Sequence, residues 1–269
     1  MWPEGKRAAA ALTFDFDAEE VWIAEDPANV RRPGVLSQGT YGAKVGVPLI
    51  LELLARHDLR ATFFVPGRVA ERHPGRVEEI LAGGHELGLH GFTHRSPARL
   101  GDDEEADELD HSIAVLSGLG AKPTGYRSPS WDFGDHTLGL LAARGLLYSS
   151  NLMDDIRPYR HEPSGIIELP VQWMLDDAPH FWFDNGASWP KKISTPSEVL
   201  EIWRAEFSAM HRLGALFVLT MHPQLIGRPS RVEMLDEFVT FVRSHGDLWL
   251  ATAGEIAAAA DAALNVRDV

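Results

Sequence analysis

Short apolar runs, rich in β-branched and aromatic residues, alternate along the chain with longer amphipathic segments. Runs of this length and composition, bounded by turn residues, predict buried strands. We expect strands at Ala9–Phe16, Ala61–Val65, Glu86–His90, Thr124–Arg127, Ile166–Val171, Leu216–Met221 and Leu248–Thr252.

The segments between these runs place apolar residues three and four positions apart, which predicts helices with one buried face. They are Val47–His57, Arg76–Ala82, Glu105–Leu119, Thr137–Arg144, Ser197–Leu213 and Arg231–His245. Gly214 directly after Leu213 is typical of a helix end. The alanine-rich stretch Ala257–Ala263 predicts a terminal helix.

Alternation of strands and helices indicates parallel strands joined by crossover helices. About seven such units in 269 residues predict an α/β fold, a distorted or incomplete (β/α) barrel, as a single catalytic domain spanning residues 1–269. An open doubly wound sheet is the competing architecture. The glycine pattern of a dinucleotide site does not follow the first strand, so that kind of site has no support.

Two segments, Ala18–Gly46 and Trp173–Thr195, lack a clear period and predict long loops. Long loops in a compact domain are usually functional. In a parallel barrel, the chemistry gathers where loops follow the carboxyl ends of strands.

Composition excludes several classes of protein. The formal net charge of −14 disfavours nucleic-acid binding and docking on anionic membranes. The chain has no cysteine, which excludes disulfides, thiolate metal sites and cysteine nucleophiles. No apolar run approaches the ~18 residues of a membrane span, and the opening residues do not resemble a signal peptide. We therefore expect a cytoplasmic protein.

Two pairs of polar residues follow predicted strands. Asp15 and Asp17 are two residues apart at the end of the first strand, so both side chains point to one face, although an isolated pair often only caps a turn. His90 and His94 are four residues apart and converge on one metal ion if the segment turns as a helix. With twelve histidines in the chain, chance spacing is the alternative.

Two single residues also end strands. His222 precedes a proline after Leu216–Met221, where a barrel enzyme places an acid or base, although many such histidines are structural. Arg127 ends another strand and could orient a carboxylate through a bidentate pair, the alternative being a surface ion pair. A parallel barrel brings all these strand ends to one rim, which makes coincidence a poor explanation.

Five segments together resemble the polysaccharide deacetylases, carbohydrate esterase family four, the nodulation-type deacetylase homologues. The segments are TFDFDAE, HGFTHRSP, GYRSPSW, ELPVQWMLDD and LTMHPQ, in the order in which the family's motifs occur. The resemblance spans residues 13–223. It implies a metal-dependent hydrolase of a carbon–nitrogen bond other than a peptide bond.

The resemblance also assigns roles. It implies that Asp15 is the catalytic base, that Asp17, His90 and His94 are the metal ligands, and that His222 is the catalytic acid. Arg127 would then hold Asp15 in place. The ligand types suit one divalent ion, Zn²⁺ being expected and Co²⁺ or Mn²⁺ the alternatives.

The surroundings of these residues are less defined by sequence. Asp176 or Asp177 could orient His222 and raise its pKa. Tyr126, Trp131 and Trp173 could wall a substrate pocket, although each is an equally good core residue.

One departure concerns the substrate. The two carboxylates are spaced Asp-Phe-Asp, whereas the family's usual motif has adjacent aspartates. The departure weakens the transfer of a sugar substrate. The downstream HPQLIGRP and the long loop with QWMLDD resemble a subfamily with intracellular peptidoglycan-deacetylase-like proteins, metal-independent allantoinase-like proteins and cyclic imide hydrolases. We expect de-N-acetylation of an amino sugar or oligosaccharide, with opening of a small cyclic imide or ureide as the alternative and a non-catalytic binding barrel as a remote one. The expected partner is this small-molecule or oligosaccharide substrate. The sequence does not decide whether the chain forms a homo-oligomer.

Overall fold

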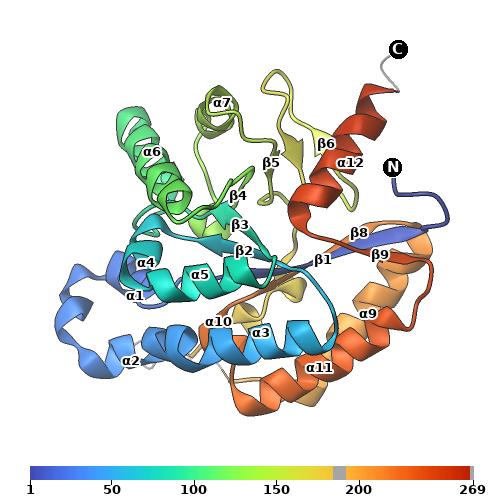
Figure 1. The fold of residues 1–269 in the computed structure, drawn as a ribbon, viewed down its shortest axis with the longest axis horizontal. Coiled ribbons are helices and arrows are strands. Elements are labelled where there is room, and N and C mark those ends of the chain that lie inside the picture. The colour runs from blue at the N-terminus through green and yellow to red at the C-terminus, as the bar shows by residue number, and fades with distance from the viewer. Residues whose placement is uncertain (184–191, 267–269) are drawn as a thin grey trace.

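A computed structural model describes residues 1–183 and 192–266. In that part of the chain, nine strands form one sheet (Figure 1). They are β1 (Ala8–Asp15), β2 (Thr62–Val65), β3 (Glu86–Leu89), β4 (Gly125–Tyr126), β5 (Tyr148–Ser149), β6 (Tyr159–Arg160), β7 (Ile167–Glu168), β8 (Leu216–Met221) and β9 (Leu248–Leu250). The strand order is β6-β7-β5-β4-β3-β2-β1-β8, with β9 also paired to β1.

The α-helices follow the strands and cover the sheet. They are α1 (Glu20–Glu25), α2 (Pro33–Tyr41), α3 (Val47–Arg56), α4 (Gly67–Arg72), α5 (Pro74–Ala82), α6 (Asp102–Gly118), α7 (Thr137–Ala143), α8 (Ala178–Phe181), α9 (Pro196–Leu213), α10 (Pro223–Ile226), α11 (Pro229–Arg243) and α12 (Ala253–Asn265). Figure 1 shows α3, α9 and α11 along one side of the sheet and α12 on the other.

The sheet is a curled, incomplete barrel, so the predicted architecture is confirmed. All described strand pairs are parallel except β6 with β7. The paired strands β6 and β7 end the sheet on one side and β8 ends it on the other. Because β1 lies between β2 and β8, its carboxyl end is flanked by neighbours on both sides.

Residues of β1 alternate between two apolar cores. Ala8, Ala10, Leu12 and Phe14 belong to the large core beneath the outer helices. Ala9 and Ala11 face a second core, in which Ile256, Ala257 and Ala260 of α12 fill the inside of the barrel. The same alternation carries on to Thr13 and Asp15, which therefore point to the inner side at the rim.

Several predicted boundaries change. The predicted loop Ala18–Gly46 is wrong, because it contains α1, a 3₁₀ helix at Pro27–Arg31, α2 and a π-helical turn at Gly42–Gly46. These helices are short and show no amphipathic period. Because that period is the signal from which helices are predicted, the sequence did not reveal them. The two-residue strands β5 and β6 and the short helices α4, α8 and α10 were not predicted either. Part of the second predicted loop, residues 184–191, lies outside the described residues.

The elements whose observed bounds agree best with the predicted ones are those with the longest apolar pattern. Strand β8 has the predicted bounds, and α12 includes the predicted terminal helix. Helix α9 begins one residue earlier than expected, because Thr195 caps it in a reciprocal pair with Glu198. None of the helices in the described ranges combines the length and apolar content that a bilayer span requires.

The π-helical turn packs directly against the segment that follows β8. Ideal side chains built on Gly46 and Gly227 would lie only 2.1 and 2.3 Å from the carbonyl oxygen of Pro223. Both positions must therefore lack a side chain for the chain to pass so near the turn after His222.

Candidate active site

The two aspartates after the first strand lie side by side at the rim of the barrel. Asp15 is the last residue of β1, and Asp17 follows two residues later. Both are buried, while Phe14 and Phe16 turn to the opposite side and fill the outer core. The sequence-based expectation that one face carries both carboxylates agrees with this arrangement.

Arg127 is fully buried behind Asp15. Its Nη1 donates to Oδ1 of Asp15 over 2.9 Å and to Oγ1 of Thr13 over 2.8 Å. Its Nη2 and Nε donate to Ser150, and its guanidinium stacks on the Phe64 ring at 4.3 Å. The expected bidentate pair is therefore wrong, because Ser150 engages the two guanidinium nitrogens that would complete it. Arg127 contacts only Oδ1 of Asp15 and does not bond to the second carboxylate oxygen.

Two histidines approach Asp17 from the segment after β3. Nε2 of His90 and Nε2 of His94 lie 3.4 and 3.6 Å from the same oxygen of Asp17, Oδ1. The segment does not turn as a helix. Instead Gly91 and His94 have positive φ angles of 67° and 55°, and this irregular turn brings the second imidazole back beside the first.

The tautomer of His90 is fixed by its other nitrogen. Nδ1 of His90 donates to the backbone oxygen of Arg127 over 2.7 Å, so Nε2 is the nitrogen that faces Asp17 and that the neutral ring would offer to an ion. A buried histidine that is oriented through a backbone carbonyl in this way is prepared to bind an electron-poor partner.

We call Asp17, His90 and His94 the Asp17 cluster and tested whether it fits a divalent ion. The three ligating atoms lie within 4.8 Å of one another. Oδ1 of Asp17 is buried and has no hydrogen-bond partner among the described residues, although buried oxygens are nearly always satisfied. One carboxylate and two imidazoles are a ligand set typical of zinc and related ions. The residues fit a metal.

Electrostatics favour the charged form of this carboxylate. Burial would raise the pKa of Asp17, but the charges of His94 and His222 and the contact with His90 hold that pKa below its ordinary value. Burial lowers the pKa of His94 to about 4, with the neighbouring His90 and His222 contributing. An ionised aspartate and a neutral imidazole are the forms that bind cations.

A second cluster of two aspartates and a histidine lies on the other side of the Asp17 carboxylate from His90 and His94. We call Asp176, Asp177 and His222 the His222 cluster. Nδ1 of His222 donates to Oδ1 of Asp177 over 2.6 Å, and the backbone N–H of His222 donates to Oδ2 of Asp177 over 3.0 Å. Asp176 is farther away, with 3.6 Å between its Oδ1 and Nδ1 of His222. Asp177 is therefore the residue that orients His222.

The two carboxylates also set the charge of His222. Burial would lower the pKa of His222, but Asp177 and Asp176 outweigh it and raise that pKa well above its ordinary value. The Nε2 atom points into the cleft, 3.8 Å from Oδ2 of Asp17. Burial, aided by the charge of Asp177, raises the pKa of Asp176 to about 7.

The His222 cluster is a poorer metal site although its ligating atoms are equally close together. Both oxygens of Asp177 accept hydrogen bonds from His222, and Oδ1 of Asp176 accepts one from the backbone of Ala178. Three of its oxygens are thus engaged, two by the imidazole residue and one by the Ala178 backbone, whereas Oδ1 of Asp17 has no hydrogen-bond partner among the described residues.

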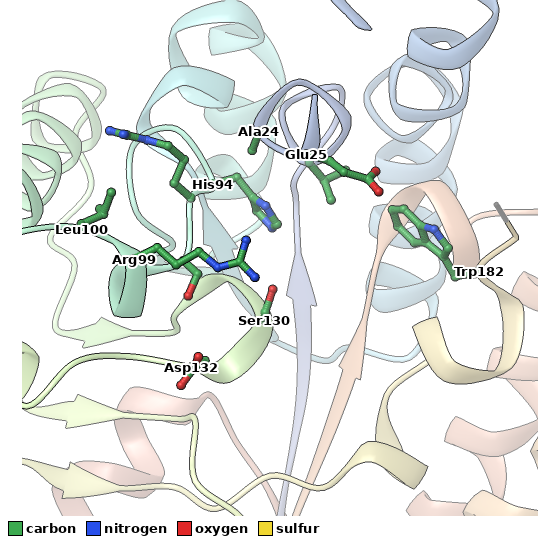
Figure 2. Close-up of a pocket in the computed structure, with 11 residues that line it drawn as sticks. Ala24, Glu25, His94, Arg99, Leu100, Ser130, Asp132 and Trp182 are labelled. Atoms are coloured by element: carbon green, nitrogen blue, oxygen red, sulfur yellow. The ribbon is translucent and has the colours of Figure 1, made fainter. Parts of the chain in front are cut away.

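Both clusters open into one cleft of about 230 Å³. The Trp131 and Trp173 rings pack 4.5 Å apart on one wall, and Trp182 stacks on Trp22 at 4.9 Å on another. The cleft shares Val21, His94, Ser130 and Trp182 with a neighbouring cavity of about 530 Å³, drawn in Figure 2. The predicted wall residues Trp131 and Trp173 line the cleft.

Tyr126 does not. It is buried in the outer core, and it is absent from the residues that line the cleft. The correction follows from strand alternation: because Arg127 points inward to Asp15, its neighbour Tyr126 points outward.

Sequence reasoning missed several residues that support the site. Nε2 of Gln224 contacts Oδ2 of Asp17 over 3.4 Å, and Thr13 and Ser150 hold Arg127. Gln224 lies two residues after His222 and could have been noticed from that spacing. The roles of Thr13, Ser150 and Trp182 depend on tertiary contacts that no local pattern encodes.

Comparisons with known proteins agree with this geometry. A family profile described as "Polysaccharide deacetylase" matches residues 37–149, a range that includes His90, His94 and Arg127. The peptidoglycan deacetylase of Helicobacter pylori is 28% identical over 281 aligned residues, covering 94% of this chain and 96% of that protein.

Solved structures extend the likeness to the whole fold. A crystal structure from Mycobacterium smegmatis, described as a candidate polysaccharide deacetylase, is 43% identical with a TM-score of 0.92, covering 96% of this chain and 91% of that one. The Puue allantoinase structure has a TM-score of 0.82 at 22% identity, covering 95% and 91%. This second likeness concerns the fold alone.

Proposed function

Because the chain belongs to the polysaccharide deacetylase family, we propose that it removes the acetyl group from the nitrogen of an amino sugar or oligosaccharide. The family predicted from the five sequence motifs is confirmed. So is the enzyme class, a hydrolase of carbon–nitrogen bonds other than peptide bonds. The substrate is the proposed part.

One observation carries the proposal. The Asp17 cluster, the Asp15–Arg127 pair and the His222 cluster converge on a single cleft that continues into a second, larger cavity. Amide hydrolysis needs a polarised carbonyl, a base for water and an acid for the leaving nitrogen. The cleft offers a residue for each task.

Asp17, His90 and His94 would hold the metal. When bound, a divalent ion supplies Lewis acidity that polarises the amide carbonyl and makes water a better nucleophile. Zn²⁺ is the ion we propose for this site, with Co²⁺ and Mn²⁺ as alternatives. The His90 bond to the Arg127 carbonyl keeps the ligand's lone pair aimed at the site.

The remaining residues move protons. Asp15 accepts the proton of the attacking water, and the Arg127 guanidinium next to it holds its carboxylate in place. Arg127 engages only one oxygen of Asp15, so the other stays available for the proton. His222 then protonates the nitrogen as the carbon–nitrogen bond breaks, and Asp177 stabilises the charged imidazole beforehand.

The alternative substrate, a small cyclic imide or ureide, would use the same three groups of residues. The shape of the site argues against it. A small ring needs only the 230 Å³ cleft, whereas the adjoining 530 Å³ cavity offers room for sugar units on the side of His94 and Ser130.

The proposal is tested by acetate release. Purified protein loaded with Zn²⁺ is incubated with oligomers of N-acetylglucosamine, with N-acetylmuramic acid and with hydantoin and succinimide. We expect acetate from the sugars and no ring opening. Asp15→Asn keeps the shape of the side chain and should lower turnover by about 10²–10⁴-fold with metal content unchanged.

Ring opening without acetate release would overturn the proposed substrate. An Asp15→Asn enzyme with normal turnover would show that Asp15 is not the base. Arg212→Gln is the matched control, since this exposed residue of α9 lines none of the described cavities.

A further inference from the structure

The large cavity next to the active site has a chemistry of its own. It shares His94, Ser130, Val21 and Trp182 with the cleft that holds the Asp17 cluster, so the two cavities adjoin. Its further walls carry Arg95 and Arg99 from the segment after β3, Glu25 from α1, and Asp132. None of these charged residues has a part in the proposed hydrolysis.

The two arginines differ in how their charge is balanced. Nη1 and Nη2 of Arg95 pair with Glu104 and Glu108 of α6 over 2.5 and 2.8 Å. Arg99 has no ion pair or side-chain hydrogen bond with any residue in 1–183 and 192–266. Figure 2 shows its guanidinium in the middle of the cavity, between the His94 ring and the Ser130 hydroxyl.

The backbone that carries Arg99 is held in place. The carboxylate of Glu108, nearly buried, accepts hydrogen bonds from the backbone N–H groups of Phe92 and Thr93, each over 2.8 Å, and from the Thr93 hydroxyl. Arg99 itself ends a 3₁₀ turn, and its N–H donates to the oxygen of Ser96 over 3.0 Å. These contacts hold the backbone of the segment that carries Arg99, while the Arg99 side chain itself is exposed to an incoming ligand.

The Arg99 guanidinium, which forms no ion pair with a described residue, selects the class of ligand. Its planar fork matches a carboxylate, which it binds through two parallel hydrogen bonds. Glu25 and Asp132 lie on other walls of the same cavity and repel a doubly charged phosphate more than a singly charged carboxylate. They also accept hydrogen bonds from sugar hydroxyls.

We propose that this cavity is a carboxylate subsite and that Arg99 binds an acidic group of the substrate beside the amide that is cleaved. The preferred substrate is then an N-acetylated sugar that carries a carboxylate, as an ether-linked acid on its own ring or on an adjoining uronic acid. This inference rests on the proposed function, because it assumes that the cleaved amide occupies the cleft at Asp17.

The kinetic test compares two substrates that differ by one carboxylate. N-acetylglucosamine and its 3-O-lactyl ether, N-acetylmuramic acid, are such a pair. Arg99→Gln should raise KM for the acidic sugar by about 10–100-fold, the range for a lost hydrogen-bonded charge pair, while kcat changes little. Its KM for the neutral sugar should not change. Arg99→Lys should recover part of the loss, and the control Arg212→Gln should show none.

A binding measurement separates this inference from the proposed function. Calorimetric titration of the Asp15→Asn protein with the same two sugars needs no turnover. Tighter binding of the acidic sugar that disappears when Arg99→Gln is added supports the subsite even if neither sugar is hydrolysed, an outcome that would reject only the proposed reaction. Equal affinity for both sugars, or a preference that survives Arg99→Gln, overturns the subsite.

Discussion

The Asp17 and His222 clusters contain the same kinds of side chain and lie in one cleft, yet they are organised differently. In the Asp17 cluster the shared oxygen has no hydrogen-bond partner among the described residues, and the two imidazoles approach it without bonding to it. In the His222 cluster every carboxylate oxygen next to the imidazole is engaged. Residue composition alone therefore does not separate a candidate ion site from a candidate proton donor, whereas hydrogen-bond satisfaction distinguishes the two clusters.

The largest expected effect is loss of the ion. His90→Ala removes one of three ligands and the imidazole that is oriented by the Arg127 carbonyl. We expect the protein to lose its bound metal and its hydrolytic activity together, because Asp17 and His94 alone make an incomplete site. Elemental analysis and titration with Zn²⁺ measure this directly. Unchanged metal stoichiometry would place the ion elsewhere, and the difference between the clusters would lose its meaning.

The next effect concerns the proton donor. His222→Ala should keep metal content normal and lower kcat/KM by about 10²–10⁴-fold for simple acetamides. The loss should be much smaller for an activated amide, because a nitrogen that leaves as a stable anion needs no proton. If activated and ordinary amides slow equally, or the ion is released, His222 belongs with the ligands.

A smaller effect distinguishes the two carboxylates next to His222. Asp177→Asn removes the charge that raises the pKa of His222, so the imidazole should deprotonate at lower pH. The alkaline limb of the kcat/KM profile should shift to lower pH, with a loss of ~10–100-fold at the optimum. Asp176→Asn is the matched variant: with 3.6 Å to Nδ1 instead of 2.6 Å, it should shift the limb less. Equal shifts would show that both orient the imidazole.

The last effect is on stability rather than catalysis, and it comes from a histidine outside both clusters. His85 is buried against the Phe63 ring, and its Nδ1 accepts from the N–H of Ala61. Burial, with the charge of Arg60, lowers its pKa to about 4. It thus shows what burial does to an imidazole that lacks the carboxylates of His222.

The sign of its contribution follows from proton binding. Between about pH 6.5 and 4 the unfolded chain binds a proton at His85 that the folded chain excludes, so stability falls as the pH is lowered through this window. The total is up to ~3 kcal/mol. Urea unfolding of wild type and His85→Asn at pH 7, 5.5 and 4.5 measures it. The wild type should lose more stability than the variant on acidification, and parallel curves would contradict the lowered pKa.

The sequence predicted much of the fold, since long apolar runs such as Leu216–Met221 carry their own register and alternation. It failed where structure depends on tertiary support. Strand β5 has two residues and exists because β4 and β7 pair with it. The helices of residues 20–46 lack an amphipathic period, so nothing local distinguished them from a loop.

The candidate site shows the same division. Asp15, Asp17, His90, His94 and His222 could be chosen because each follows a strand, and parallel strands end at one rim. The choice between Asp176 and Asp177 could not be made, because neighbouring residues differ only in which side they face. Nor could the sequence reveal that Arg99 has no ion pair with any described residue while Arg95 has two, since that depends on where α6 packs.

The close approach of Gly46 to the carbonyl of Pro223 bears on how this enzyme can change over time. Any larger residue at Gly46 would press on the turn that begins at His222, about 180 residues away in the chain. A loss-of-function screen should therefore recover substitutions at Gly46 beside those of the charged residues, although glycine offers no group for catalysis. Sequence drift is restricted there by space rather than by chemistry.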